Sequence, residues 1–143
     1  MQDNNLIYKK LRKKALKKYK EIGIIKCPIF NNEIIHFNSK GFNHLVRKGR
    51  IIRPIKEQRN RFYLIRFAKR IIQNPPNRTI IEFEQRSIKE RVNKFGNKKN
   101  IKKPAKFWTI NYIYRNILIK LVIIQVFGRN KEFLSIMSSD LNK

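Results

Sequence analysis

The chain has 143 residues, enough for one domain with a workable core, and 41% of them are apolar, which excludes a wholly disordered chain. Its 35 Lys and Arg against 9 Asp and Glu give a formal net charge of +26 and predict a polyanionic partner, usually nucleic acid. In an alternative interpretation, the A/T-rich codons of Lys, Ile and Asn explain part of this excess. Codon drift would replace Arg by Lys, yet a cluster of arginines persists: Arg47, Arg50, Arg53, Arg59, Arg61, Arg66 and Arg70.

A single cysteine, Cys27, excludes an internal disulfide or a thiolate metal cluster and favours a reducing compartment. Residues 1–19 lack the features of a secretory signal. The longest apolar run, residues 117–127, is interrupted by Lys120 and is shorter than the ~20 residues that cross a bilayer. We therefore expect a cytoplasmic protein with no membrane span, no metal and no cofactor.

The first half of the chain is predicted to be mainly helical. Apolar side chains recur at helical spacing near the N-terminus, and the turn signal Asn31-Asn32 separates two short apolar runs. Ser39 is a candidate helix cap, and Gly49 is a stop signal. The expected elements are a basic helix over 5–21, a hairpin over 24–30 and 33–37, a short helix over 41–48, and a long helix from Arg53-Pro54 to about Gln73.

The second half is predicted to be mainly β-structure. Residues 86–106 are basic and aperiodic, and they are expected to form a long loop or arm. The run over 118–127 is apolar on both faces and should be the central strand. The expected strands cover 79–85, 107–114, 118–127 and 132–137.

This order of elements predicts an α+β fold, with helices packed on one face of a four-stranded antiparallel sheet. The other face of the sheet would be open. The basic helix within residues 1–22 and the hairpin that follows it would be additions to this layout. Residues 23–143 would form a single domain.

One charged pair continues the apolar stripe of the long helix. Leu64, Ile65 and Ala68 share a helix face with Arg61 and Glu57, which are four residues apart. A charged pair on the core-facing side is costly to bury, so it usually lies at a pocket edge or in a polar network. A peripheral salt bridge that closes the helix end is the alternative explanation.

His44 is a candidate proton-transfer residue. It lies opposite Phe42, Leu45 and Val46 on its short helix, so it is not expected to fill the core. Imidazole is the usual side chain for taking a proton from a ribose 2′-hydroxyl or returning one. A lone surface histidine is the alternative interpretation, and His36, in a predicted strand, is interpreted as structural.

Ser135 is expected on the open face of the sheet. In the last strand Leu134 and Ile136 would face the helices, which leaves Phe133, Ser135 and Met137 on the other side. A hydroxyl there can contact a phosphate oxygen, although a tolerated serine in an edge strand explains it as well. With His44 and several arginines, and without a metal-ligand motif, this set suits metal-independent RNA cleavage.

The element order over residues 24–138, the closing hairpin and a Gly-x-x-His pattern together carry a family resemblance. The pattern lies in the run Ile34-Ile35-His36-Phe37-Asn38-Ser39-Lys40-Gly41-Phe42-Asn43-His44-Leu45. The closing hairpin comprises residues 119–125 and 132–137. These features resemble the small nucleases of the barnase, EndoU, colicin-type tRNase and RelE-like (BECR) superfamily, and most of all its phage-associated branch.

The resemblance implies two helices on a four-stranded antiparallel sheet, with RNA lying across the open face. His44 would be the helix-borne catalytic histidine and Ser135 the last-strand hydroxyl. The phosphate-binding cations would be Arg47, Arg50 and Arg61. Two departures, the lack of a second well-placed histidine and the longer basic arm, leave an inactive RNA-binding relative open.

The first functional hypothesis is a metal-independent endoribonuclease or ribonuclease-like toxin, in which His44, Arg61 and Ser135 are catalytic. RNA is favoured over DNA as the partner, and a neutralising protein with an acidic segment is a further hypothesis. The nucleic-acid-binding side chains would be Arg47, Arg50, Arg53, Lys9, Arg12, Lys13, Lys17, Lys98, Lys99, Lys102 and Lys103.

Two other hypotheses stay open. The second is a non-catalytic RNA- or DNA-binding protein, such as a ribosome- or nucleoprotein-associated subunit, in which Trp108, Tyr112 and Tyr114 stack bases. The third is a membrane-surface protein that uses the basic N-terminal helix.

Overall fold

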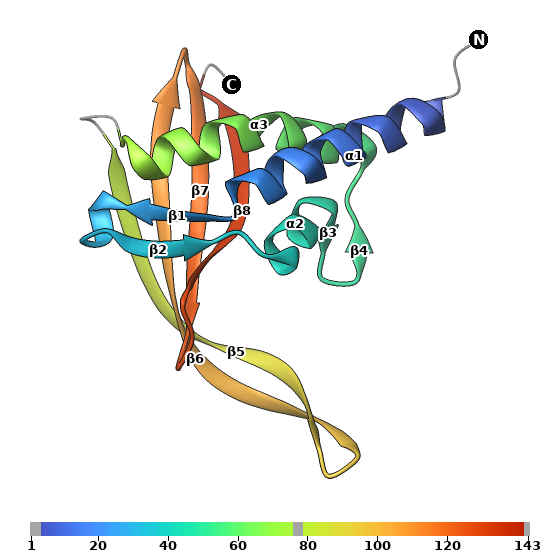
Figure 1. The fold of residues 1–143 in the computed structure, drawn as a ribbon, viewed down its shortest axis with the longest axis vertical. Coiled ribbons are helices and arrows are strands. Elements are labelled where there is room, and N and C mark those ends of the chain that lie inside the picture. Colours follow the sequence, from blue (N-terminus) through green and yellow to red (C-terminus); the bar gives the residue numbers. More distant parts are fainter. Residues whose placement is uncertain (1–3, 76–78, 142–143) are drawn as a thin grey trace.

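The computed structural model describes residues 4–75 and 79–141, and this part of the chain contains three α-helices, one 3-10 turn and eight strands (Figure 1). The helices are α1 (Asn4–Ile22), α2 (Ser39–Val46) and α3 (Ile55–Gln73), and the 3-10 turn is η1 (Pro28–Phe30). The strands are β1 (Ile24–Cys27), β2 (Glu33–His36), β3 (Arg47–Lys48), β4 (Ile51–Ile52), β5 (Ile80–Lys94), β6 (Asn97–Tyr114), β7 (Ile117–Val126) and β8 (Lys131–Asp140).

The three expected helices are present, with small shifts at their ends. α2 begins two residues earlier than predicted, because its N-cap is Asn38 and not Ser39. The Asn38 side chain accepts a hydrogen bond from the Gly41 amide at 3.3 Å, as an N-cap does. None of the helices in the described residues is long and apolar enough to span a membrane.

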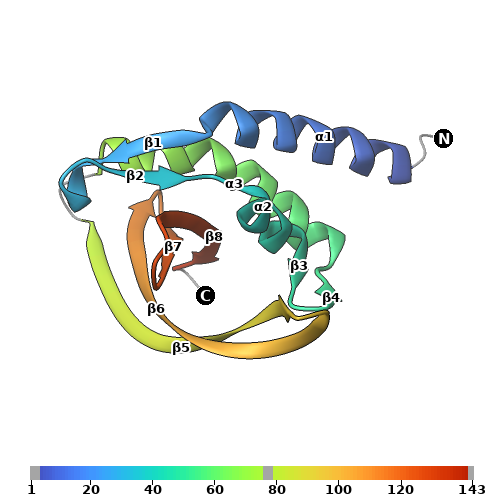
Figure 2. The ribbon, with the colours of Figure 1, turned by 60° about the horizontal axis from the view of Figure 1, so that its bottom comes forward.

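Six strands form one curled, mixed sheet in the order β1-β2-β8-β7-β6-β5, and β3 and β4 form a separate small hairpin (Figure 2). The prediction of a four-stranded antiparallel sheet is therefore wrong, although the α+β class is right. The difference arises because β2 pairs with β8 in parallel, through Ile35–Lys131 and His36–Glu132. A parallel pair needs a long crossover connection, which the segment with α2 and α3 helps to provide. The pattern within a strand does not reveal which neighbour it will have.

The loop expected over residues 86–106 is a two-stranded β-ribbon instead. β5 pairs with β6 along its whole length, and the turn residues Phe95 and Gly96 have φ of 54° and 79°. Two successive positive φ values fit the turns that hairpins favour. The pairing provides hydrogen-bond partners for the backbone N–H and C=O groups of this segment. Strands therefore form although the charged side chains of the segment do not alternate with apolar ones. In Figure 1 the ribbon extends well beyond the other strands.

The helices pack on one face of the sheet around an apolar core to which α1 belongs. Ala15 and Tyr19 of α1 are buried in this core, and the Tyr19 hydroxyl donates to the Asn38 carbonyl at 2.6 Å. Burial raises the pKa of Tyr19, and nearby Glu132 raises it further, so the hydroxyl stays protonated and can donate. The N-terminal helix is thus an integral part of the fold.

The opposite face of the sheet is covered in part. Phe107 and Ile124 are paired neighbours on this face, and they form a second apolar cluster with Ala105 and Val126. Ile88, from the base of the ribbon, packs against the same cluster. The expectation of a wholly open face is therefore corrected near the end of the sheet where the ribbon begins.

Candidate active site

A continuous chain of polar contacts joins α2, the start of α3 and β8. Arg53 donates from Nε to the His44 carbonyl oxygen at 2.9 Å, and its Nη1 donates to Glu57 Oε1 at 2.9 Å. The same carboxylate oxygen accepts from Arg61 Nη2 at 3.1 Å. Arg61 Nη1 in turn donates to Ser135 Oγ at 2.9 Å. We call these five residues the His44 network.

The local sequence explains the contacts among Arg53, Glu57 and Arg61. Arg53, Glu57 and Arg61 are spaced by four residues, so their side chains lie along one line of α3 and the turn before it. Gln58 fixes the start of the helix, because its Nε2 donates to the Arg53 carbonyl at 2.7 Å and its Oε1 accepts from the Tyr8 hydroxyl. α1 and α3 are thereby tied together where the network begins.

The network holds more positive than negative charge in a buried place. Arg53 and Arg61 are only 7% and 6% exposed, and both use the single carboxylate of Glu57. Burial, followed by the charge of Arg53, lowers the pKa of Arg61, and Glu57 offsets part of this. Within the described residues Arg61 Nε has no hydrogen-bond partner. A surplus guanidinium of this kind creates a positive potential that favours an anion nearby.

Ser135 lies on the helix side of the sheet, which corrects its predicted placement. The pairing of β7 with β8 shifts register between Val122 and Ile123, where a β-bulge leaves Leu134 without a partner. The bulge changes the alternation, so Ser135 is 2% exposed and bonded to Arg61 of α3. Phe133 is buried too, stacked on Phe37 at 4.7 Å between ring centroids. Neither side chain is on an open face.

His44 stands at the surface end of the network. It lines a shallow hollow of about 590 Å³, and the hollow lies between α1, α2 and the β3–β4 hairpin. Its Nδ1 is 3.5 Å from Arg53 Nη2. Burial, then the charges of Arg53, Arg61 and Lys48, lower the pKa of His44 from 6.5 to about 4. The imidazole is therefore neutral at physiological pH. The other residues that line the hollow are Arg12, Lys40, Asn43, Arg47 and Gly49.

The structure brings some of the predicted nucleic-acid-binding residues together and separates others. Arg12 and Arg47 line the hollow, and Arg50 is exposed nearby in the β3–β4 turn. Arg53 is buried inside the His44 network and not on the surface. The α1 residues Lys9, Arg12, Lys13 and Lys17 are exposed, as are Lys98, Lys99 and Lys102 of the ribbon, while Lys103 is half-buried.

The aromatic side chains expected to stack bases are used in packing. Trp108 contacts Phe30 at 5.1 Å and Phe83 at 5.5 Å between ring centroids. Tyr112 and Tyr114 are partly buried against the main core. All three side chains are half-buried, and their stacking on bases stays a prediction.

Sequence reasoning missed a basic groove between α1 and α3. The groove has a volume of about 360 Å³, and Tyr63, which is exposed, lies on its wall. The Arg66 guanidinium lies over the Tyr63 ring at 4.1 Å from the centroid. No local signal predicts this groove, because its two walls come from helices 40 residues or more apart in the chain. Its cationic lining residues are Lys14, Lys18, Arg59 and Arg66.

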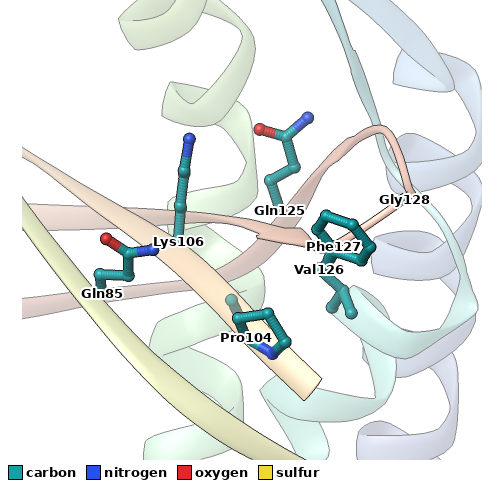
Figure 3. Close-up of a pocket in the computed structure, with 8 residues that line it drawn as sticks. Gln85, Pro104, Lys106, Gln125, Val126, Phe127 and Gly128 are labelled. Atoms are coloured by element: carbon teal, nitrogen blue, oxygen red, sulfur yellow. The ribbon is translucent and has the colours of Figure 1, made fainter.

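Another pocket lies at the base of the ribbon, where β5, β6 and β7 meet (Figure 3). It has a volume of about 230 Å³ and is lined by Gln85, Lys106, Gln125 and Phe127 among others. Figure 3 shows the Lys106 and Gln125 side chains projecting to the same side of the sheet. Lys106 is the one titratable side chain among the residues that line it, so this pocket offers little chemistry of its own.

No group of three or more His, Cys, Asp or Glu side chains able to hold a metal ion occurs among residues 4–75 and 79–141. Searches of protein-family models, of curated proteins and of solved structures each return no match to this chain. The resemblance to the BECR nucleases therefore stays a prediction that rests on residues of this sequence.

Proposed function

We propose that this protein is a metal-independent endoribonuclease whose active site is the hollow at His44. The observation that supports this most is the His44 network. Three residues chosen from the sequence for one reaction, His44, Arg61 and Ser135, belong to three separate elements, yet they lie in one chain of contacts with Arg53 and Glu57.

The composition of the network also supports a functional role. Burying two guanidinium groups is costly, and replacing buried ion pairs by apolar side chains of similar volume is often neutral or stabilising. A network that only secured the start of α3 would not need surplus positive charge or an unpaired Arg61 Nε. A side chain that has a shifted pKa and lines a hollow, as His44 does, is typical of active sites.

In the proposed reaction the RNA phosphate is bound in the hollow by Arg12, Lys40 and Arg47. Neutral His44 accepts the proton of the ribose 2′-hydroxyl, and the 2′-oxygen attacks phosphorus. The bond between phosphorus and the 5′-oxygen breaks, and the 5′-oxygen takes a proton from solvent. The products are a 2′,3′-cyclic phosphate and a free 5′-hydroxyl.

The buried residues would act through position and charge. Arg53 and Arg61 stabilise negative charge that develops on the phosphorane, because they stand behind His44 in a region of low solvent access. The bound phosphate offsets the cations that lower the pKa of His44, so its basicity rises when substrate is present. Ser135 is a positioning residue, since it contacts Arg61 and is shielded from the hollow.

The test is cleavage of an end-labelled RNA in the presence of a chelator. We expect the wild-type chain to cut and to leave 2′,3′-cyclic phosphate ends, and His44→Ala to lower the rate on the order of 10²–10⁴-fold. His36→Gln is the matched control, because His36 is the other histidine, lies in β2 and is not among the residues that line the hollow. Cleavage by His44→Ala at the wild-type rate would overturn the proposal.

A second candidate function is RNA binding without cleavage. It is favoured by α1, on which all eight cationic side chains are exposed and Glu21 is the one acidic residue. This surface neutralises a phosphate backbone whether or not His44 reacts. Salt-sensitive binding without cleavage, by both wild type and His44→Ala, would establish this function in place of the first.

A further inference from the structure

We propose that the β5–β6 ribbon is a second RNA-binding surface, so that the natural substrate is a polymeric RNA that extends from the His44 hollow along the ribbon. Only the part of this inference that concerns the hollow rests on the proposed function. The inference adds the class of substrate, which the hollow by itself does not define. A mono- or dinucleotide would fill the hollow without reaching the ribbon.

One face of the ribbon carries cations and no acid. Successive side chains of a strand point to opposite faces, and the pairing of β5 with β6 places Lys89 opposite Lys102 and Gln85 opposite Lys106. No acidic residue occupies this face between Gln85 and Lys106. The five cations on it are all exposed: Lys89, Arg91, Lys98, Lys102 and Lys106.

The cationic side chains on this face repel one another when no anion is bound. Like charges directly opposite each other on paired strands are destabilising, and Lys89 and Lys102 are such a pair. Arg91 and Lys98 add charge diagonally on the same face. Ser87, Asn100 and Pro104 also lie on this side, and Pro104 is the one apolar residue among them. An arrangement of this kind is stabilised by binding a polyanion.

The other face holds the ribbon in place next to the hollow. Glu90 Oε1 accepts a hydrogen bond from Arg129 of the β7–β8 turn, and Glu90 Oε2 forms an ion pair with Lys103 Nζ at 3.2 Å. Arg129, followed by Lys103, lowers the pKa of Glu90. Glu90 also lies 4.0 Å from Lys40 of α2, and Lys40 lines the His44 hollow. The ribbon therefore begins beside the proposed active site with its Glu90 face toward the body, so RNA that leaves the hollow would reach the cationic face around the edge of the ribbon.

RNA is the occupant that these features fit. Its backbone offers a regular row of negative charges, which matches two rows of cations on a stiff strand pair. From Ser87 to the turn at Phe95 the ribbon is about 26 Å long at ~3.3 Å per residue. A chain of several nucleotides is needed to cover that length. Contacts to phosphate carry no sequence information, so the ribbon would raise affinity for any RNA sequence.

The experiment compares two triple variants with equal loss of charge. The ribbon variant is Lys89→Gln, Arg91→Gln and Lys102→Gln, and the control is Lys26→Gln, Lys69→Gln and Arg70→Gln. The control residue Lys26 is exposed on β1. Lys69 and Arg70 are exposed near the C-terminal end of α3, ~21–23 Å from its first residue, Ile55, at 1.5 Å per residue. The substrates are a 30-nucleotide RNA and a dinucleoside monophosphate.

For the long RNA we expect the ribbon variant to raise KM on the order of tenfold with kcat unchanged. Each phosphate contact contributes roughly 0.7 to the slope of log affinity against log salt for single strands, so the slope should fall by about 2. The dinucleotide should show no change in KM. The control variant should differ from wild type by less than twofold on both substrates.

Binding alone separates failure of this inference from failure of the proposed function. The Kd of the 30-nucleotide RNA is measured by fluorescence anisotropy in a His44→Ala background, where no cleavage is required. A weaker Kd and a lower salt slope in the ribbon variant support the ribbon surface even if wild type never cuts RNA. An unchanged Kd and salt slope, or an equal loss in the control variant, would overturn it. A double variant on the same face, Lys98→Gln and Lys106→Gln, must also weaken the Kd and lower the salt slope.

Discussion

The His44 network and the β5–β6 ribbon both carry surplus positive charge, but they hold it in opposite ways. In the network, buried guanidinium groups are fixed by hydrogen bonds to Glu57, Ser135 and backbone carbonyls. On the ribbon, exposed ammonium and guanidinium groups stand side by side without an acidic partner on their face. Substitutions should therefore change stability and chemistry in the first region and affinity in the second.

The largest expected effect comes from Glu57→Gln. This change keeps the shape of the side chain but removes the one carboxylate that both Arg53 and Arg61 use. Two buried cations would then lack their counter-charge. Because the Glu57 side chain is itself 41% exposed, the loss in free energy of unfolding should lie at the lower end of the range for buried pairs, about 3 kcal/mol. Urea denaturation measures this value. A loss below ~1 kcal/mol, the range of exposed salt bridges, would mean that the network is only a surface feature.

Two glycine substitutions compare the packing of the helices and central sheet with that of the ribbon. A Cβ at Gly41 would collide with the Tyr19 hydroxyl and with the carbonyl oxygen and ring of Phe133. We expect Gly41→Ala to cost about 1–3 kcal/mol through overpacking. Gly96, at the ribbon turn, has open space around it and a φ of 79°.

Gly96→Ala should therefore cost about 1 kcal/mol through backbone strain alone. Its effect should be confined to the ribbon, which amide hydrogen exchange can resolve. Thermal unfolding of the two variants gives the ranking. Equal losses, or a larger loss for Gly96→Ala, would contradict the view that the body is tightly packed and the ribbon loosely constrained.

The pKa of His44 predicts how stability depends on pH. The folded chain keeps this pKa at about 4, below the ordinary value of 6.5, so the unfolded chain binds a proton more readily. Above pH 6.5 both states are neutral at this residue and it contributes no slope. As pH falls from 6.5 to 4, the free energy of unfolding should fall, and below 4 this residue adds no further loss. His44→Asn should flatten that window in urea titrations, and an unchanged slope would contradict the assignment.

The smallest expected effect concerns the ribbon by itself. Lys102→Glu replaces the repulsion between Lys89 and residue 102 by an attraction. Cross-strand charge pairs are worth roughly 0.2–1 kcal/mol, so the ribbon should become slightly more stable. Faster hydrogen exchange of the ribbon amides in this variant would contradict a repulsion between Lys89 and Lys102. RNA affinity should fall at the same time, since a positive charge is removed.

Much of the local structure was predictable, because it depends on short-range patterns. The periodicity around Leu64 and Ala68 predicts α3 to within a few residues, and the strand-like runs over 107–137 predict β7, β8 and the second part of β6. The stripe that runs into Arg61 and Glu57 predicts a charged pair, and the structure pairs them, with Arg61 buried and the Glu57 side chain 41% exposed.

Features that depend on distant partners were not predictable in this way. The bulge at Leu134 turns Ser135 toward α3, and nothing within the strand indicates it. The parallel pairing of β2 with β8 and the α1–α3 groove likewise join segments far apart in sequence. The ribbon escaped prediction because strands that bury few apolar side chains show charge where the usual signal is hydrophobic.

The central claim is that the neutral imidazole of His44 removes the 2′-proton of RNA held in the cationic hollow. The most direct test uses one RNA and its counterpart with a single 2′-deoxy substitution at the mapped cut site, both in chelator. We predict that the substitution abolishes cutting at that position while the Kd changes less than twofold. Cutting of the 2′-deoxy substrate at the wild-type rate, or no cutting of the unmodified RNA, would contradict it.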